Sequence, residues 1–357
     1  MRNLAILSLA SALTVATFLP LVPSTAWWIR ALDIPRVQVA VAIGLALPFC
    51  LVLTDPWRAL AVAALVGSLA FQLWKIFPYT PLAKPEMKLA APSGDGQDVS
   101  FLAANILKEN SRYDAVRSLI RSEDPDVLFL METDARWIAE MEPVLADYPV
   151  VVRVPKDNYY GFVFATRLKA LRAEAVMLTS SDTPTLFAEL DAPNGQRFRF
   201  VGLHPRPPVP GEDTDERDAQ ILYAARFARQ SDLPVVVLGD FNVAAWSRAA
   251  RMFKRVGRYL DPRVGRGLYS SFDATHPILR APIDQLHVTP DVAIVSFGRG
   301  GKIGSDHFPM ITRLRFDAEL AARLNRSPGV IPEAEAREIE ARVDRYRTTL
   351  GHDKDRF

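Results

Sequence analysis

Cysteine is almost absent from this sequence, since Cys50 is the only one in 357 residues. A single cysteine cannot form a disulfide within the chain, and it excludes the cysteine clusters that hold structural zinc. An excess of either charge is also missing, because 43 basic residues face 41 acidic ones. Domains that bind long nucleic acids through bulk charge are usually distinctly basic, so this balance argues against them while leaving room for a local basic groove.

Charged residues are scarce at the start of the chain. Residues 1–90 hold seven basic and three acidic side chains, whereas residues 91–357 carry a net charge of −2. The first part contains three apolar runs, at 3–22, 37–53 and 57–77, and a membrane-spanning helix needs about 20 apolar residues. Aromatic side chains that favour the membrane interface stand at the ends of these runs, namely Trp27, Trp28, Trp57, Trp74 and Tyr79. We therefore expect a membrane anchor of three transmembrane helices over residues 1–77; a cleaved signal peptide and a buried helical hairpin are the alternatives.

The basic residues around these runs predict an orientation. With the N-terminus outside the cell, five basic residues fall on the cytoplasmic side: Arg30, Arg36, Lys75, Lys84 and Lys88. In the opposite orientation only Arg2 and Arg58 do. Because cytoplasmic loops carry an excess of Lys and Arg, the count favours a multi-pass protein of the cell (inner) membrane whose following domain is cytoplasmic. One miscounted span would reverse the side.

After a predicted linker at residues 78–98, which holds four prolines and two glycines, short strands and helices alternate through residues 99–316. Polar residues mark the ends of the predicted strands. Four of them end a strand, namely Asn105, Glu132, His204 and Asp240, the last followed closely by Asn242. At two other places a polar residue begins a predicted strand, namely at Asp284 and at the pair Asp306 and His307. If the second group of strands runs antiparallel to the first, all these side chains meet at one edge of the sheets.

Such an edge would gather carboxylates, imidazoles and amides. Carboxylates a few ångströms apart repel one another unless a cation neutralises them, and their oxygens, like those of amides, suit Mg²⁺ or Mn²⁺. The set fits phosphoester hydrolysis. A metal at Glu132 would polarise a phosphoryl oxygen, while His307, oriented by Asp240 or Asp284, would activate water.

Six motifs in order resemble the endonuclease/exonuclease/phosphatase superfamily, which includes deoxyribonuclease I, exonuclease III-like nucleases, neutral sphingomyelinases and inositol-polyphosphate 5-phosphatases. They are AAN at 103–105, DVLFLME at 126–132, GLH at 202–204, GDFN at 239–242, PID at 282–284 and GSDHFPM at 304–310. The resemblance implies an α/β fold, a four-layer α/β sandwich of two packed mixed β-sheets flanked by helices, here preceded by three transmembrane helices. It also implies Mg²⁺-dependent cleavage of a phosphoester.

The resemblance further implies a role for each site residue. Its metal residues are Glu132 as principal ligand, Asn105 as supporting neighbour and Asp306 close to the metal. Its catalytic residues are His204, Asp240, Asn242, Asp284 and His307. Among these, His307 is expected to act as the base, Asp240 with Asn242 to orient the nucleophile and phosphate, and Asp284 to lie near the leaving group. Gln285 departs from the pattern, because many members carry His or Tyr there, and this puts substrate contacts in doubt.

These features predict a membrane-anchored, Mg²⁺-dependent phosphoesterase that hydrolyses a lipid or small phosphoester, with the bilayer as a partner and no obligate protein partner evident. A deoxyribonuclease I-like endonuclease is the first alternative. It would use a helical arginine face as its groove for nucleic acid, formed by Arg248, Arg251, Arg255 and Arg258. A non-catalytic membrane scaffold is the second alternative. Residues 317–357 are predicted to be a charged helical tail with an apolar stripe of Ile339, Val343, Tyr346 and Leu350.

Overall fold

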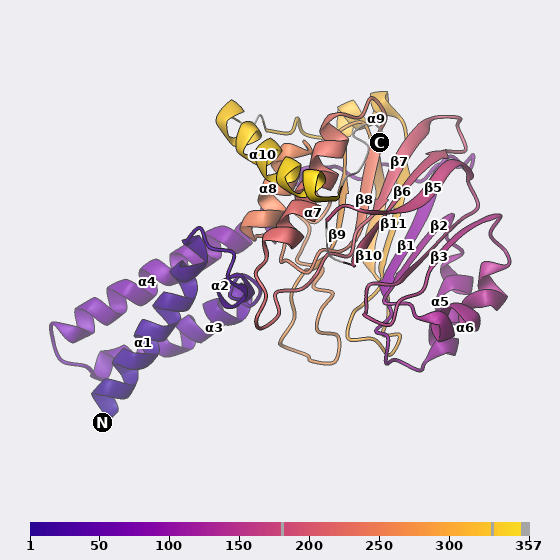
Figure 1. Cartoon of the computed structure of the whole chain (residues 1–357). Helices are drawn as coiled ribbons and strands as arrows, with labels where there is room; N and C mark the ends of the chain where they lie inside the picture. Colours follow the sequence, from indigo (N-terminus) through magenta and orange to yellow (C-terminus); the bar gives the residue numbers. More distant parts are fainter. Residues whose placement is uncertain (180–181, 330–331, 351–357) are drawn as a thin grey trace.

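The computed structural model describes residues 1–179, 182–329 and 332–350. The end of the predicted tail, residues 351–357, lies outside the described residues, and so do the side chains of Tyr346 and Leu350. The described chain forms a helical bundle at the N-terminus and a layered α/β body that carries the rest (Figure 1).

Two sheets form the centre of the α/β body. The strands of the first sheet are β1 (Val99–Asn105), β2 (Val127–Met131), β3 (Val150–Val154), β4 (Phe162–Thr166), β10 (Ala293–Arg299) and β11 (Met310–Arg315), in the order β10-β11-β1-β2-β4-β3. Those of the second sheet are β5 (Lys169–Met177), β6 (Pro184–Asp191), β7 (Arg197–Gly202), β8 (Val235–Asp240) and β9 (Asp284–Val288), in the order β5-β6-β7-β8-β9. Apolar side chains from both sheets fill the space between them, among them Phe101, Phe129 and Phe200.

Helices cover the outer face of each sheet. The first sheet packs against α5 (Tyr113–Glu123) and α6 (Ala135–Leu145). The second packs against α7 (Asp215–Arg229), α8 (Arg248–Val256) and α10 (Glu333–Leu350), and α10 contributes the buried Ile339 and Val343 to this layer. A short helix, α9 (Ala318–Leu324), precedes α10. The predicted four-layer sandwich of two mixed sheets flanked by helices is thus confirmed.

The strand directions bring the polar strand ends to one edge. β1 runs parallel to β2, and β7 runs parallel to β8. In contrast, β11 is antiparallel to β1 and β9 is antiparallel to β8, with Asp240 and Asp284 as direct partners in the register. The ends of the first group and the beginnings of the second therefore share an edge, which is the condition that the sequence pattern required.

The N-terminal bundle contains α1 (Arg2–Phe18), α2 (Trp27–Ala31), α3 (Arg36–Ala46) and α4 (Trp57–Ile76), extended by short 3₁₀ turns. Two helices, Arg2–Leu21 and Trp57–Tyr79, are long and apolar enough to cross a membrane. The other predicted span corresponds to the shorter helix Arg36–Val52, whose last six residues are 3₁₀. At the usual rises it is about 28 Å long, against a hydrocarbon core of about 30 Å. Membrane crossing therefore remains a prediction for all three spans, and Arg36–Val52 is the shortest of them.

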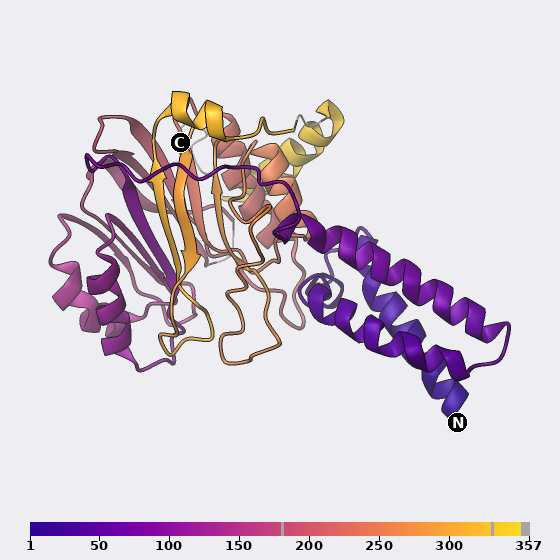
Figure 2. The same cartoon turned by 180° about the vertical axis from the view of Figure 1, so that it is seen from behind.

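The predicted linker at 78–98 has little regular structure but follows the surface of the α/β body closely (Figure 2). Met87 is fully buried in the core between the sheets, and the Ala90 amide donates a hydrogen bond of 2.8 Å to the Ile294 carbonyl of β10. These contacts attach the bundle to the body along the length of the segment, so the segment is packed rather than loose.

Candidate active site

The eight predicted site residues come from six places on the common sheet edge. Asn105 and Asp240 are the last residues of β1 and β8, and Glu132 directly follows β2. His204 follows β7, with Asn242 in the loop after β8. Asp284 begins β9, and Asp306 with His307 precedes β11. The contacts below link all of these residues except Asn242 and Asp306 into one group.

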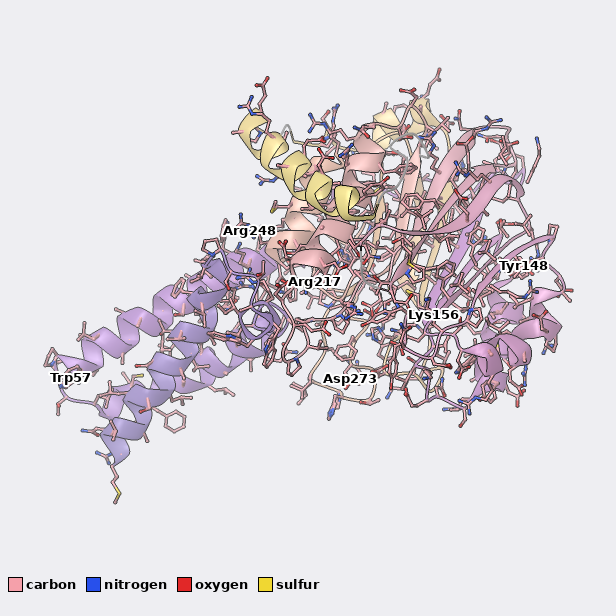
Figure 3. The ribbon with its side chains drawn as sticks, viewed as in Figure 1. Trp57, Tyr148, Lys156, Arg217, Arg248 and Asp273 are labelled. Atoms are coloured by element: carbon pink, nitrogen blue, oxygen red, sulfur yellow. The ribbon has the colours of Figure 1, made fainter. Side chains whose placement is uncertain are left out.

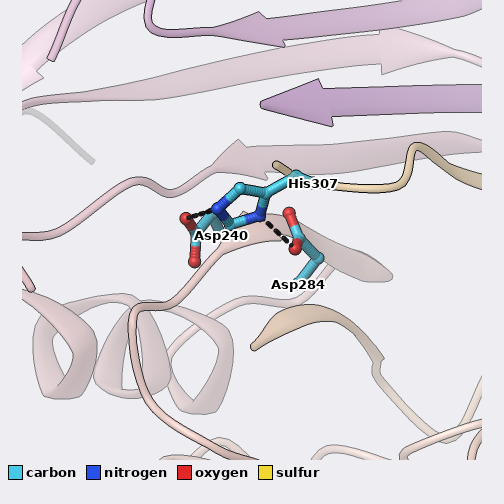
Figure 4. Close-up of side chains that lie close together, drawn as sticks. All are labelled: Asp240, Asp284 and His307. Carbon is cyan, nitrogen blue, oxygen red and sulfur yellow. Dashed lines mark hydrogen bonds and ion pairs between the residues drawn. The ribbon is translucent and has the colours of Figure 1, made fainter. Parts of the chain in front are cut away.

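His307 stands between two carboxylates (Figure 4). Its Nδ1 atom is 2.7 Å from Asp284 Oδ2, and its Nε2 atom is 3.6 Å from Asp240 Oδ2. All three side chains are at most 4% exposed. The sequence had left Asp240 and Asp284 as alternatives for the residue that orients His307, and the hydrogen bond to Nδ1 identifies Asp284. The other ring nitrogen of His307, Nε2, is directed at Asp240.

The two histidines of the site have opposite electrostatic environments. Burial disfavours the charged form of His307, but Asp284 and Asp240 outweigh burial and raise the pKa of His307 to about 10. Burial, with a further contribution from the nearby charge of His307, lowers the pKa of His204 to about 3. At neutral pH, before substrate binds, His307 is therefore protonated while His204, whose Nε2 lies 3.8 Å from Asp240 Oδ2, is neutral.

Glu132 and Asn105 form a second pair beside this group. Asn105 Nδ2 donates hydrogen bonds to Glu132 Oε1 at 2.8 Å and to Asp240 Oδ2 at 3.3 Å. The Lys108 amide donates to the other oxygen, Glu132 Oε2, at 3.2 Å. Burial raises the pKa of Glu132, although the bonds from Asn105 and Lys108 lower it. Asn105 thus holds the Glu132 carboxylate in place and links it to the Asp240 carboxylate.

The donor set fits a hard divalent cation. Glu132, Asp240, Asp284 and Asp306 supply carboxylate oxygens. Burial raises the pKa of Glu132 and of Asp240, so the negative charge of these two is costly without a compensating cation. Asp240, Asp284 and His307 each offer a ligand atom within 4.8 Å of the others. His307 Nδ1 and Asp284 Oδ2 form a hydrogen bond with each other. A cation held by the predicted ligands Glu132 and Asp306 would leave this hydrogen bond intact. The Asn105 amide oxygen accepts from the Leu107 amide, which suits a supporting role.

The predicted residue Asn242, and Gln285, which departs from the family pattern, make contacts that the sequence did not indicate. Asn242 has a positive φ of 50° and donates from Nδ2 to the Pro205 carbonyl at 2.9 Å, so it fixes the proline-rich loop after His204. Gln285 is fully buried on the opposite face of β9 from Asp284, where it accepts from Arg263 and donates to the Val243 carbonyl. Gln285 therefore supports the strand from behind and does not face the site.

Sequence reasoning missed several residues that surround the group. Ser271 Oγ accepts from the Asp284 amide at 3.0 Å, and Ser305 Oγ donates to the Asn105 carbonyl at 2.8 Å. The Phe272 and Tyr160 rings lie against His307 and His204, with ring centres 4.9 and 5.6 Å apart. Ser305 lies within the GSDHFPM motif, but Ser271, Phe272 and Tyr160 lie in loops outside every motif. These residues reach the site only because the fold brings distant segments of the chain together.

Comparisons with known proteins were made against this geometry. The model of the Endonuclease/Exonuclease/phosphatase family matches residues 100–307. No curated protein matches the sequence. A solved endonuclease/exonuclease/phosphatase from Bacteroides vulgatus has a TM-score of 0.51 at 19% identity, covering 62% of this chain and 99% of its own.

Two further solved structures share the fold. A D. rerio TDP2 humanized by 14 mutations has a TM-score of 0.51 at 16% identity, covering 61% of this chain and 99% of its own. An endonuclease/exonuclease/phosphatase family protein from Bacteroides thetaiotaomicron has a TM-score of 0.50 at 17% identity, covering 62% and 98%. The residues that match the family model fall on the α/β body that carries the site.

Proposed function

Because the chain belongs to the Endonuclease/Exonuclease/phosphatase family, and is accordingly a metal-dependent phosphoester hydrolase, we propose that it is anchored in the membrane and uses Mg²⁺ to hydrolyse a phosphoester presented at the bilayer. A phospholipid or a small phosphoester is the substrate class that we favour.

In this proposal, Glu132 and Asp306 hold the cation, and Asn105 keeps Glu132 in position. The bound Mg²⁺ supplies a Lewis acid that neutralises charge on the phosphoryl oxygens. In its neutral form, His307 takes a proton at Nε2 from the attacking water as the P–O bond to the leaving group breaks, and Asp284 stabilises the resulting imidazolium through the 2.7 Å contact at Nδ1. His204 is neutral and donates to an oxygen of the phosphoryl group, while Asp240 orients the attacking water.

One loop carries the argument for a substrate at the bilayer. It spans residues 271–281 and contacts the catalytic segment at one end, where the Phe308 amide donates to the Ser271 carbonyl and the Ala274 amide donates to the Asp306 carbonyl. The other part of the loop contacts the bundle, because Gln38 Nε2 in α3 donates to the carbonyls of Ile278 and Arg280, both at 2.9 Å. Asp273 marks the loop in Figure 3.

The apolar tip of this loop lies at the level where α3 begins. Ile278 and Leu279 are 77% and 57% exposed, and Gln38 is the third residue of α3. Exposed aliphatic side chains beside the first turn of a membrane helix would lie in the bilayer interface. The loop would then connect the membrane surface directly to His307, which supports a substrate that stays in the bilayer.

A loop variant tests the proposal. The double variant I278S/L279S should lose most of its hydrolysis of phospholipid vesicles yet keep its hydrolysis of a water-soluble phosphodiester, both measured on the full chain with Mg²⁺. L171S is the matched control, since Leu171 in β5 is an exposed aliphatic residue away from the anchor, and it should behave as the wild type. Equal loss on both substrates, or no loss on vesicles, would contradict the role of the loop.

A further inference from the structure

A second feature of the membrane-proximal surface lies between the end of α4 and α8, away from the catalytic group. It is a cleft of about 990 Å³ that we call the basic cleft. Its wall on the bundle side contains Trp74, Lys75 and Tyr79, and its wall on the other side contains Arg248 and Arg251. Figure 3 shows Arg248 at the place where the bundle meets the α/β body.

Three cations of the basic cleft, Lys75, Arg248 and Arg251, form no ion pair with a carboxylate that the structure describes. The side chains of Arg248 and Arg251 form no hydrogen bond or ion pair with any residue that the structure describes. Glu86 is the acidic residue among the described lining, and it already pairs with Lys254. The cleft therefore carries an excess of positive charge that its own acidic residue does not neutralise.

Lys75 makes the strongest case for a ligand. Its side chain is only 7% exposed, and its ammonium lies over the rings of Phe71 and Trp74, at 5.4 and 4.9 Å from their centres. Among the described residues no carboxylate pairs with it. A buried ammonium is costly unless an anion accompanies it. The described residues do not supply that anion, so a bound ligand would have to supply it.

The position of the cleft limits the choice of anion. Trp74 is 65% exposed near the end of α4, where the chain would leave the bilayer, and tryptophan favours the headgroup level of a membrane. An anion held between this ring and α8 would thus lie at the depth of lipid phosphates. Basic residues next to a membrane helix bind acidic lipid headgroups in general.

We propose that the basic cleft binds the phosphate of an anionic phospholipid headgroup, with Lys75, Arg248 and Arg251 as its cationic partners. The lipid is a bound ligand that fixes the α/β body against the bilayer, and it is not the substrate of the catalytic group. This inference rests on the membrane anchor of the proposed function but needs none of its chemistry.

The structure also provides a control on the same segment. The sequence pattern placed Arg258 on one helical face with Arg248, Arg251 and Arg255, but α8 ends at Val256, and Arg258 follows with a positive φ of 54°. Arg258 is exposed and does not line the cleft. R258Q therefore removes an exposed arginine of the same region without changing the basic cleft.

The test measures binding to the full chain in neutral detergent micelles, by the shift of its thermal unfolding temperature with added short-chain phosphatidylglycerol. Phosphatidylcholine of the same chain length and inorganic phosphate are the comparison ligands. Two arginines near a membrane surface contribute about 1 kcal/mol each, so R248Q/R251Q should weaken phosphatidylglycerol binding about 30-fold. R258Q should bind as the wild type, and so should E132Q, which removes the predicted metal ligand.

Four outcomes would overturn the proposal. They are equal shifts with phosphatidylcholine and phosphatidylglycerol, unchanged affinity in R248Q/R251Q, the same loss in R258Q, and a shift with inorganic phosphate as large as that with the lipid. Extraction of the chain from membranes by detergent but not by alkali tests the anchor separately. A failure of lipid binding with the anchor intact would therefore count against the basic cleft alone.

Discussion

Replacing Asp284 by Asn tests how the site prepares its base. The substitution keeps the shape of the side chain but removes the negative charge 2.7 Å from His307 Nδ1, in a place where both side chains are nearly fully buried. A hydrogen bond to a charged group contributes about 1.5–3 kcal/mol. Taking the upper value of about 3 kcal/mol, the pKa of His307 should fall by about two units, because one unit corresponds to about 1.4 kcal/mol.

The sign of the effect on the pH profile follows from the role of the base. His307 accepts a proton only when its ring is neutral, so activity is lost as the pH falls below its pKa. Because Asp284 and Asp240 raise that pKa, removing the Asp284 charge should move the acid limb to lower pH. The plateau above it should fall about 100-fold, since the imidazolium formed during the reaction also loses about 3 kcal/mol of stabilisation.

The assay is the pH dependence of kcat/KM for a water-soluble phosphodiester at saturating Mg²⁺, for the wild type and D284N. H307Q serves as the reference that lacks the base and should show no such limb. Thermal unfolding of each variant checks that the fold is kept. An acid limb that moves to higher pH in D284N, or a plateau equal to that of the wild type, would refute the pairing of Asp284 with a catalytic His307.

Three further substitutions probe the site and its support. E132Q should lower kcat/KM on the order of 1,000-fold, whereas the partly exposed E123Q should leave it unchanged; equal values for E132Q and the wild type would remove Glu132 from the metal site. N105A frees Glu132 from its 2.8 Å hydrogen bond and should weaken Mg²⁺ binding about 10–100-fold, as measured by titration, with activity recovered at high Mg²⁺. R263L leaves the fully buried Asp261 without its 2.7 Å partner and should cost about 3–5 kcal/mol of unfolding free energy. That loss should shrink at low pH, where Asp261 becomes protonated; a loss independent of pH would contradict this cause.

The order of polar residues along the chain was enough to predict the shared edge, because each motif combines a buried strand with its terminal residue. Asp240 illustrates this, since the β-branched run before it is fully buried in β8 and delivers the carboxylate to the edge. The layered fold followed from the resemblance of the six motifs to a known family. The elements that the pattern did not predict have weaker signals. α6 contains Pro143 near its end, and β3 is short and only partly buried.

Contacts between distant segments lay beyond the reach of the sequence. The choice of Asp284 as the partner of His307 depends on the antiparallel register of β8 and β9, which no local pattern encodes. The same is true of Gln38 and the loop at 271–281, whose contact spans 240 residues. Arg258 shows a prediction that went too far. The helical spacing of the arginines was extended to Arg258, but the helix ends before it, at Val256.

The central claim is that a metal-dependent site cleaves a phosphoester at the bilayer. Its most direct test is hydrolysis by the full chain in membranes, comparing phospholipid vesicles with supercoiled plasmid, each with Mg²⁺, with a chelator and with H307A. We expect release of phosphate-containing product from vesicles that needs both Mg²⁺ and His307, with the plasmid left intact. Cleavage of plasmid without hydrolysis of lipid would contradict it and would favour the nuclease alternative.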